Sequence, residues 1–130
     1  ILSNDFLPSF GNVVVTSADT LANNPDLVKR FTTAVTTSYE WVIDGHVKDA
    51  LQISMDKYTP TWADQMDTLT TAFEKTFVAS VWQSPLTKEK GLGAADFDAW
   101  QQNADILAEY GVIEKAPKAT DFVVDPSSIQ

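Results

Sequence analysis

The chain has 130 residues, of which 44% are hydrophobic and 11% aromatic, enough to bury the core of a globular domain. Eighteen acidic and nine basic side chains give a formal charge of −9, so the phosphates of a nucleic acid would be repelled and nucleic-acid binding is disfavoured. No apolar run approaches the length of a membrane-spanning helix. Cysteine is absent, which excludes disulfides and thiolate chemistry.

The first residue is Ile1, with neither an initiator methionine nor a signal peptide before the first apolar elements. We therefore expect the chain to be a processed piece of a longer precursor that carries its signal peptide upstream.

Residues 11–42 predict a strand followed by a capped helix. The β-branched run 13–15 (VVV) suits a strand that is buried on both faces. Asn24 is a favourable N-cap and Pro25 suits the first helical position. One apolar stripe runs along this helix: Leu27, Val28, Phe31, Ala34, Val35, Ser38 and Val42. A single strand needs a partner, so this segment predicts a sheet whose other strands lie elsewhere.

The following residues predict a succession of helices. Gly45 is a natural C-cap for the first long helix, and Thr59-Pro60 ends the next. Thr61 is placed to cap a further helix with the stripe Trp62, Met66, Leu69, Phe73 and Phe77. Residues 77–82 fit either an extension of that helix or an extended segment.

Residues 83–94 have the composition of an exposed loop. Asp96 then opens a helix with the stripe Phe97, Trp100, Ala104, Leu107 and Ala108, and Gly111 closes it. A short apolar run at 122–124 predicts a small extended segment. The chain is therefore predicted to be mainly α, with one or two short strands.

Few residues suggest catalysis or metal binding. His46 is the only histidine, so a metal site with two imidazoles cannot form within one chain, and we interpret it as a helix-boundary residue. Two acidic pairs, Asp64 with Asp67 and Asp96 with Asp98, are explained by the dipole preference of first helical turns. The segment 91–93 (GLG) lacks the preceding strand and further glycine of a phosphate-binding loop. We predict no catalytic residue, no metal ligand and no cofactor.

The four tryptophans are more distinctive. Trp62 and Trp100 lie on apolar stripes and are predicted to be core residues, whereas Trp41 lies just off its stripe. Trp82 is next to the loop, which makes it the candidate for stacking on a ligand; the simpler interpretation is that it covers the hydrophobic core.

The order of these segments resembles the C-terminal part of the substrate-binding proteins of ABC importers. The nearest group includes the thiamine-precursor (NMT1/THI5-like) and the nitrate, taurine and alkanesulfonate binders. The most specific pieces are the valine run leading into NPDLVKRF and the GLG segment leading into Asp98, Trp100 and Gln101. The resemblance implies a type II periplasmic-binding-protein fold, in which two α/β lobes close on a small molecule without a catalytic step. It also implies that residues 1–12 are a hinge crossing and residues 13–130 the C-terminal portion of lobe one.

The same resemblance implies a periplasmic or extracellular protein, compatible with a lipid anchor on the full-length form, whose partner is an ABC permease. Its ligand would be pyrimidine-like or sulfonate/nitrate-like. By position, Asp5 and Phe6 at the hinge and Trp82 and Ser84 at the later loop are candidate ligand-binding residues. The sole arginine, Arg30, lies inside a helix, which slightly favours the pyrimidine-like ligand because an anion usually needs such a partner.

Three further expectations depend on what the chain lacks. The N-terminal βαβ units of the family pattern are missing from it, so we expect the apolar strand and stripes to be covered by a strand-exchanged homo-oligomer. A stand-alone helical interaction domain is one alternative function. The other is part of a thiamine-pyrimidine synthase-like enzyme, whose histidine and cysteine chemistry this chain does not offer.

Overall fold

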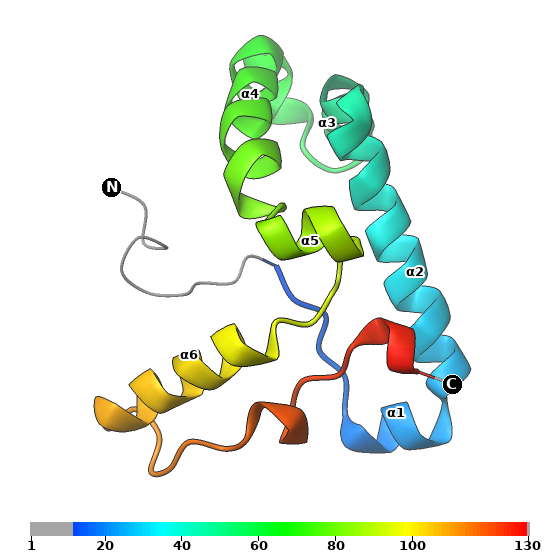
Figure 1. The fold of residues 1–130 in the computed structure, drawn as a ribbon. Helices are drawn as coiled ribbons and strands as arrows, with labels where there is room; N and C mark the ends of the chain where they lie inside the picture. Colours follow the sequence, from blue (N-terminus) through cyan, green and yellow to red (C-terminus); the bar gives the residue numbers. More distant parts are fainter. Residues whose placement is uncertain (1–11, 130) are drawn as a thin grey trace. The chain divides into compact units, whose positions relative to one another are not determined.

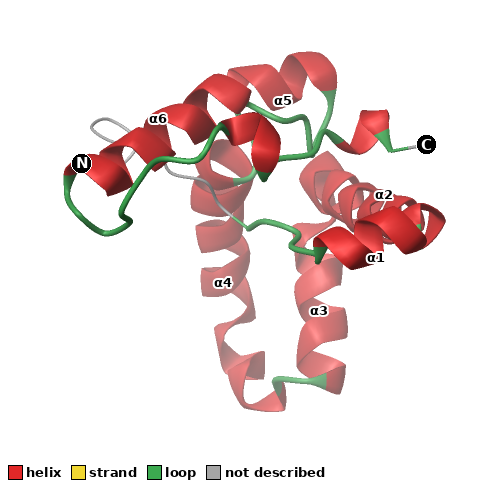
Figure 2. Cartoon of the chain, turned by 90° about the horizontal axis from the view of Figure 1, so that it is seen from below, coloured by secondary structure: helices red, strands yellow, loops and turns green. Residues whose placement is uncertain are grey.

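A computed structural model of the protein describes residues 12–129, which form helices and connecting segments without any strand. Figure 2 shows this helical content. The mainly α prediction is therefore confirmed for this range, and the predicted strands are wrong. The chain divides into two compact units, one made of residues 1–29 with 93–130 and the other of residues 30–92.

The apolar run at residues 13–15 is irregular chain rather than a strand. The side chains of Val13, Val14 and Val15 are 52%, 46% and 83% exposed. A strand forms only where a neighbouring segment pairs with its backbone, and no backbone hydrogen bond joins residues 13–16 to another part of the described chain. The second predicted extended segment, 122–124, is also wrong, because the N–H groups of Phe122 and Val123 close a 3-10 turn on the Ala119 carbonyl.

The first unit contains α1 (Ala18–Asn23), the start of α2 (Pro25–Trp41), α6 (Phe97–Glu109), and the 3-10 turns η5 (Ala119–Asp121) and η6 (Pro126–Ser128). Helix α2 begins at Pro25, as predicted. Asp96 caps α6 by accepting a hydrogen bond from the Ala99 N–H at 3.0 Å, and Gly111, with a φ of 69°, follows its end. The buried apolar residues of this unit are Val28, Ala104, Ala119 and Ile129, which form a small core.

The chain after α6 turns back alongside that helix (Figure 1). Gln101 holds the two together: its Oε1 accepts a hydrogen bond from the buried Ala119 N–H at 2.8 Å, and its Nε2 donates to the Pro117 carbonyl at 3.2 Å. The Trp100 ring meets that of Phe122 edge to face, with centroids 5.9 Å apart. Gln101 and Trp100 thus fasten the C-terminal segment to α6.

The second unit begins within α2, whose buried side differs from the predicted stripe. Val28 and Thr32 are buried, whereas Leu27 and Phe31 are 52% and 57% exposed. Among the described residues, only one edge of the predicted apolar stripe on α2 is therefore buried.

Helix α2 ends at a kink, η2 (Val42–His46), before α3 (Val47–Lys57). Gly45 has a φ of 103°, a left-handed conformation that glycine adopts without strain. The predicted stop at Gly45 is therefore confirmed. His46 folds back here: its Nδ1 lies 2.9 Å from the Trp41 carbonyl, and its ring stacks on the Trp41 ring.

Helix α3 and helix α4 (Met66–Ala72) lie side by side, joined by the 3-10 turn η3 (Pro60–Gln65) (Figures 1 and 2). Val47 and Met55 are buried in this hairpin. Thr61 is not a cap, because Pro60 already starts the turn one residue earlier. Trp62 is 50% exposed, so its predicted place in the core is wrong.

Helix α4 continues into η4 (Phe73–Val81), a wider helical segment. Residues 77–81 are therefore helical, and Trp82 caps the end: its backbone N–H donates to the Phe77 carbonyl at 2.8 Å. The predicted loop at 83–94 contains a short helix, α5 (Pro85–Lys90). That prediction was wrong because Ser84 and Pro85 form a helix start as well as a turn signal.

Candidate functional site

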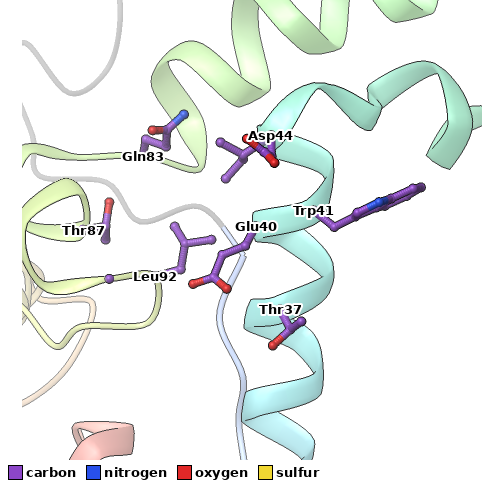
Figure 3. A pocket seen from close by; sticks show the side chains of 9 residues that line it. Thr37, Glu40, Trp41, Asp44, Gln83, Thr87 and Leu92 are labelled. Atoms are coloured by element: carbon purple, nitrogen blue, oxygen red, sulfur yellow. The ribbon is translucent and has the colours of Figure 1, made fainter.

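An open groove of about 530 Å³ lies within the second unit, between the end of α2 and the segment around α5 (Figure 3). This volume is in the range of small-molecule pockets. The lining residues come from two stretches of the chain: Thr37, Glu40, Trp41, Ile43 and Asp44 from α2 and its kink, and Gln83, Thr87, Gly91 and Leu92 from the α5 segment.

The α2 wall carries two carboxylates. Glu40 lies in the last turn of α2, and Asp44 lies in the kink η2, where its ψ of 19° departs from helical geometry. Both are exposed, and neither forms a hydrogen bond or an ion pair with a described residue. In Figure 3 the Glu40 side chain points toward Leu92, whereas the Trp41 ring points away from the groove. The negative charge on this wall is therefore open to a ligand.

The opposite wall is held by short-range hydrogen bonds. Gln83 donates from Nε2 to the Val78 carbonyl at 2.7 Å, which fixes its amide and leaves Oε1 as an acceptor. The Ser84 hydroxyl accepts from the Thr87 N–H at 3.1 Å, and the Thr87 hydroxyl accepts from the Ser84 N–H at 2.7 Å. This reciprocal pair satisfies two backbone donors at the start of α5.

Trp82 packs into an aromatic cluster behind this wall. Its ring meets Tyr39 edge to face at 4.8 Å between centroids, and it also contacts Phe73 and Phe77. Its Nε1 is buried and has no hydrogen-bond partner among the described residues. The cluster therefore anchors the chain just before Gln83.

The four residues predicted to bind ligand have different positions. Asp5 and Phe6 lie outside the described residues. Trp82 and Ser84 are not among the residues that line the groove. They flank Gln83, which does line it. The groove residues Glu40, Asp44 and Gln83 were not singled out from the sequence.

Other groups considered from the sequence have local roles. Asp96 caps α6, and Asp67 accepts a hydrogen bond from Lys48 Nζ at 3.2 Å. Within residues 12–129 no three histidine or acidic side chains gather as metal ligands. No helix in the described part of the chain is long and apolar enough to cross a membrane.

The comparison with protein families matches the segment that carries the opening strand prediction and α2. Residues 9–48 match the NMT1/THI5-like family. The suspected resemblance is therefore confirmed over this stretch, which includes Thr37, Glu40, Trp41, Ile43 and Asp44 of the groove. No curated protein and no solved structure gives a significant match.

Proposed function

We propose that this chain is the C-terminal segment of an extracytoplasmic solute-binding protein that captures a small molecule for an ABC importer. The observation that carries the proposal is the NMT1/THI5-like match over residues 9–48. In this proposal residues 1–12 form the hinge crossing and residues 13–130 the C-terminal portion of lobe one of a type II periplasmic-binding-protein fold. The protein acts outside the cytoplasm and delivers its ligand to an ABC permease.

Exposed apolar side chains within the matched segment support this proposal. Val15 is 83% exposed, and Leu27 and Phe31 on α2 are more than half exposed. Covering an apolar side chain of this size contributes about 1.5–3 kcal/mol. Strands of the same lobe supplied by the rest of the protein would cover the valine run; in the isolated chain, a second copy would do so by strand exchange. Light scattering of the isolated chain tests this last point: a dimer is expected, and a monomer contradicts it.

The groove in the second unit is the surface that we propose to contact the ligand. Gln83 provides a polar contact there through its Oε1, and its neighbours Trp82 and Ser84 position it. Asp5 and Phe6 contribute from the hinge. The absence of arginine and lysine from the groove lining supports a pyrimidine-like ligand over a sulfonate or nitrate.

The NMT1/THI5-like group also includes pyrimidine-synthesising enzymes, which makes an enzyme the second candidate. Stacking of the sole histidine, His46, on Trp41, with its Nδ1 against the Trp41 carbonyl, favours a structural role for it. A binding protein is therefore the preferred proposal.

The test is a thermal-shift screen of the full-length protein with taurine, nitrate, hydroxymethylpyrimidine and riboflavin. A ligand that binds only the folded state raises the melting temperature by mass action. One member of the panel is expected to do so and to be recovered unchanged after incubation. Recovery of a chemically altered pyrimidine would support the enzyme instead.

A further inference from the structure

We infer that the groove between residues 37–44 and 83–92 binds a small organic cation, such as an alkylammonium or amidinium compound. The inference deepens the proposed function by naming the class of ligand, and it rests on that function for the ligand's biological origin. Its physical basis is the imbalance of hydrogen-bonding groups and charge on the two walls.

The groove offers an excess of acceptors. Glu40 and Asp44 each provide two carboxylate oxygens without a described partner, and the Gln83 Oε1 is available because only its Nε2 is engaged. The Thr87 hydroxyl is already used in the α5 cap. A ligand with several N–H donors complements such a lining, whereas a sulfonate or a nitrate brings only acceptors.

The charge on the lining has one sign. Lysine and arginine are absent among the nine lining residues, so no lining side chain neutralises Glu40 and Asp44. Glu40 lies in α2 and Asp44 in the kink that follows it, so the same wall of the groove presents both carboxylates. A chain with a formal charge of −9 also attracts cations at long range.

A metal ion fits the groove less well than an organic cation. Calcium takes six to eight oxygen ligands, and within the described residues no group of three acidic or histidine side chains provides them. Ile43 and Leu92 add apolar surface beside the carboxylates, which suits the hydrocarbon part of an organic cation. The volume of about 530 Å³ exceeds what a single ion needs.

The experiment titrates the 130-residue chain with butane-1,4-diamine and follows amide chemical shifts by NMR. Butane-1-sulfonate and calcium serve as the comparison ligands. The diamine is expected to shift the amides of residues 37–44 and 83–92 saturably, with weaker binding in high salt because the charges are exposed. Shifts of equal size and location with the sulfonate, or displacement of the diamine by equimolar calcium, would overturn the inference.

Substitutions that remove one charge test the two carboxylates directly. Glu40→Gln and Asp44→Asn are each expected to weaken diamine binding roughly two- to fivefold, the effect of one exposed ion pair. Glu74→Gln is the matched control, because Glu74 is an exposed helical carboxylate outside the groove lining. An equal effect of all three variants would show a general charge effect and refute the site. Circular dichroism verifies that each variant folds.

The full-length protein separates this inference from the proposed function. If a neutral or anionic solute stabilises the full-length protein, while the diamine binds neither the isolated chain nor the full-length protein, the cation inference is refuted and the transport function is supported. If the diamine binds as described and no solute stabilises the full-length protein, the groove stands and the transport function fails.

Discussion

Replacing Gln101 by alanine tests how the C-terminal segment is held against α6. The Gln101 amide is the hydrogen-bond partner of the Ala119 N–H, at 2.8 Å, and Ala119 is only 4% exposed. Alanine at position 101 leaves that buried donor without its acceptor. Water can replace the bond to the exposed Pro117 carbonyl, so that second bond contributes little.

The expected cost follows from the orphaned donor. A buried polar group that loses its partner costs about 1–3 kcal/mol, so we expect the free energy of unfolding to fall by about 2 kcal/mol. That is a large fraction of a typical domain stability of about 5–15 kcal/mol. If the segment detaches locally before the chain unfolds, the same energy appears as faster exchange of the Ala119 amide, by roughly 30-fold.

Urea unfolding and amide hydrogen exchange measure these two quantities. Gln102→Ala is the matched control, because Gln102 is exposed on the same helix and its side chain forms no hydrogen bond with a described residue. It should change stability by less than about 0.5 kcal/mol. Equal effects of the two substitutions on both measurements would refute the role assigned to Gln101.

The remaining predictions concern the α5 cap, the kink at Gly45, one buried valine and one exposed valine. Ser84→Ala should lower stability by about 1 kcal/mol by thermal unfolding, and Ser80→Ala, which removes only a hydroxyl bonded within its own helix, should cost clearly less; equal losses would contradict the cap. Gly45→Ala should cost about 1–2 kcal/mol through its φ of 103° alone, because an added Cβ meets nothing within 4 Å; a neutral result would show that the kink relaxes. Val47→Ala should cost about 2 kcal/mol in the isolated chain because Val47 is 2% exposed. Val15→Ala should be nearly neutral there and destabilising in the full-length protein; neutrality in both would contradict the proposed covering of the valine run.

Much of the helical order follows from local signals. Pro25, Asp96 and Gly111 mark helix ends through capping and backbone geometry, which depend on a few neighbouring residues. The stop at Gly45 was found for the same reason. The valine run led to a wrong strand prediction, because strand formation depends on a partner segment and the described chain provides none. The start of α5 was missed because Ser84 and Pro85 also suit a turn, and the pairing of Ser84 with Thr87 decides between them.

The groove was harder to predict. Its walls come from stretches about forty residues apart, 37–44 and 83–92, and sequence spacing alone does not bring them together. The one available signal was the spacing of Glu40 and Asp44, which predicts a shared helix side. Trp82 was singled out for its place beside a loop, whereas the aromatic cluster of Tyr39, Phe73 and Phe77 shows what it packs against.

The measurement that tests the central proposal most directly is the melting temperature of the full-length protein with and without each solute. A solute-binding protein should gain about 2.7 kcal/mol of stability at a ligand concentration one hundred times the dissociation constant. We predict a rise with one class of solute, which is then recovered unchanged. A melting temperature that neither the panel nor butane-1,4-diamine raises would contradict the proposed transport function.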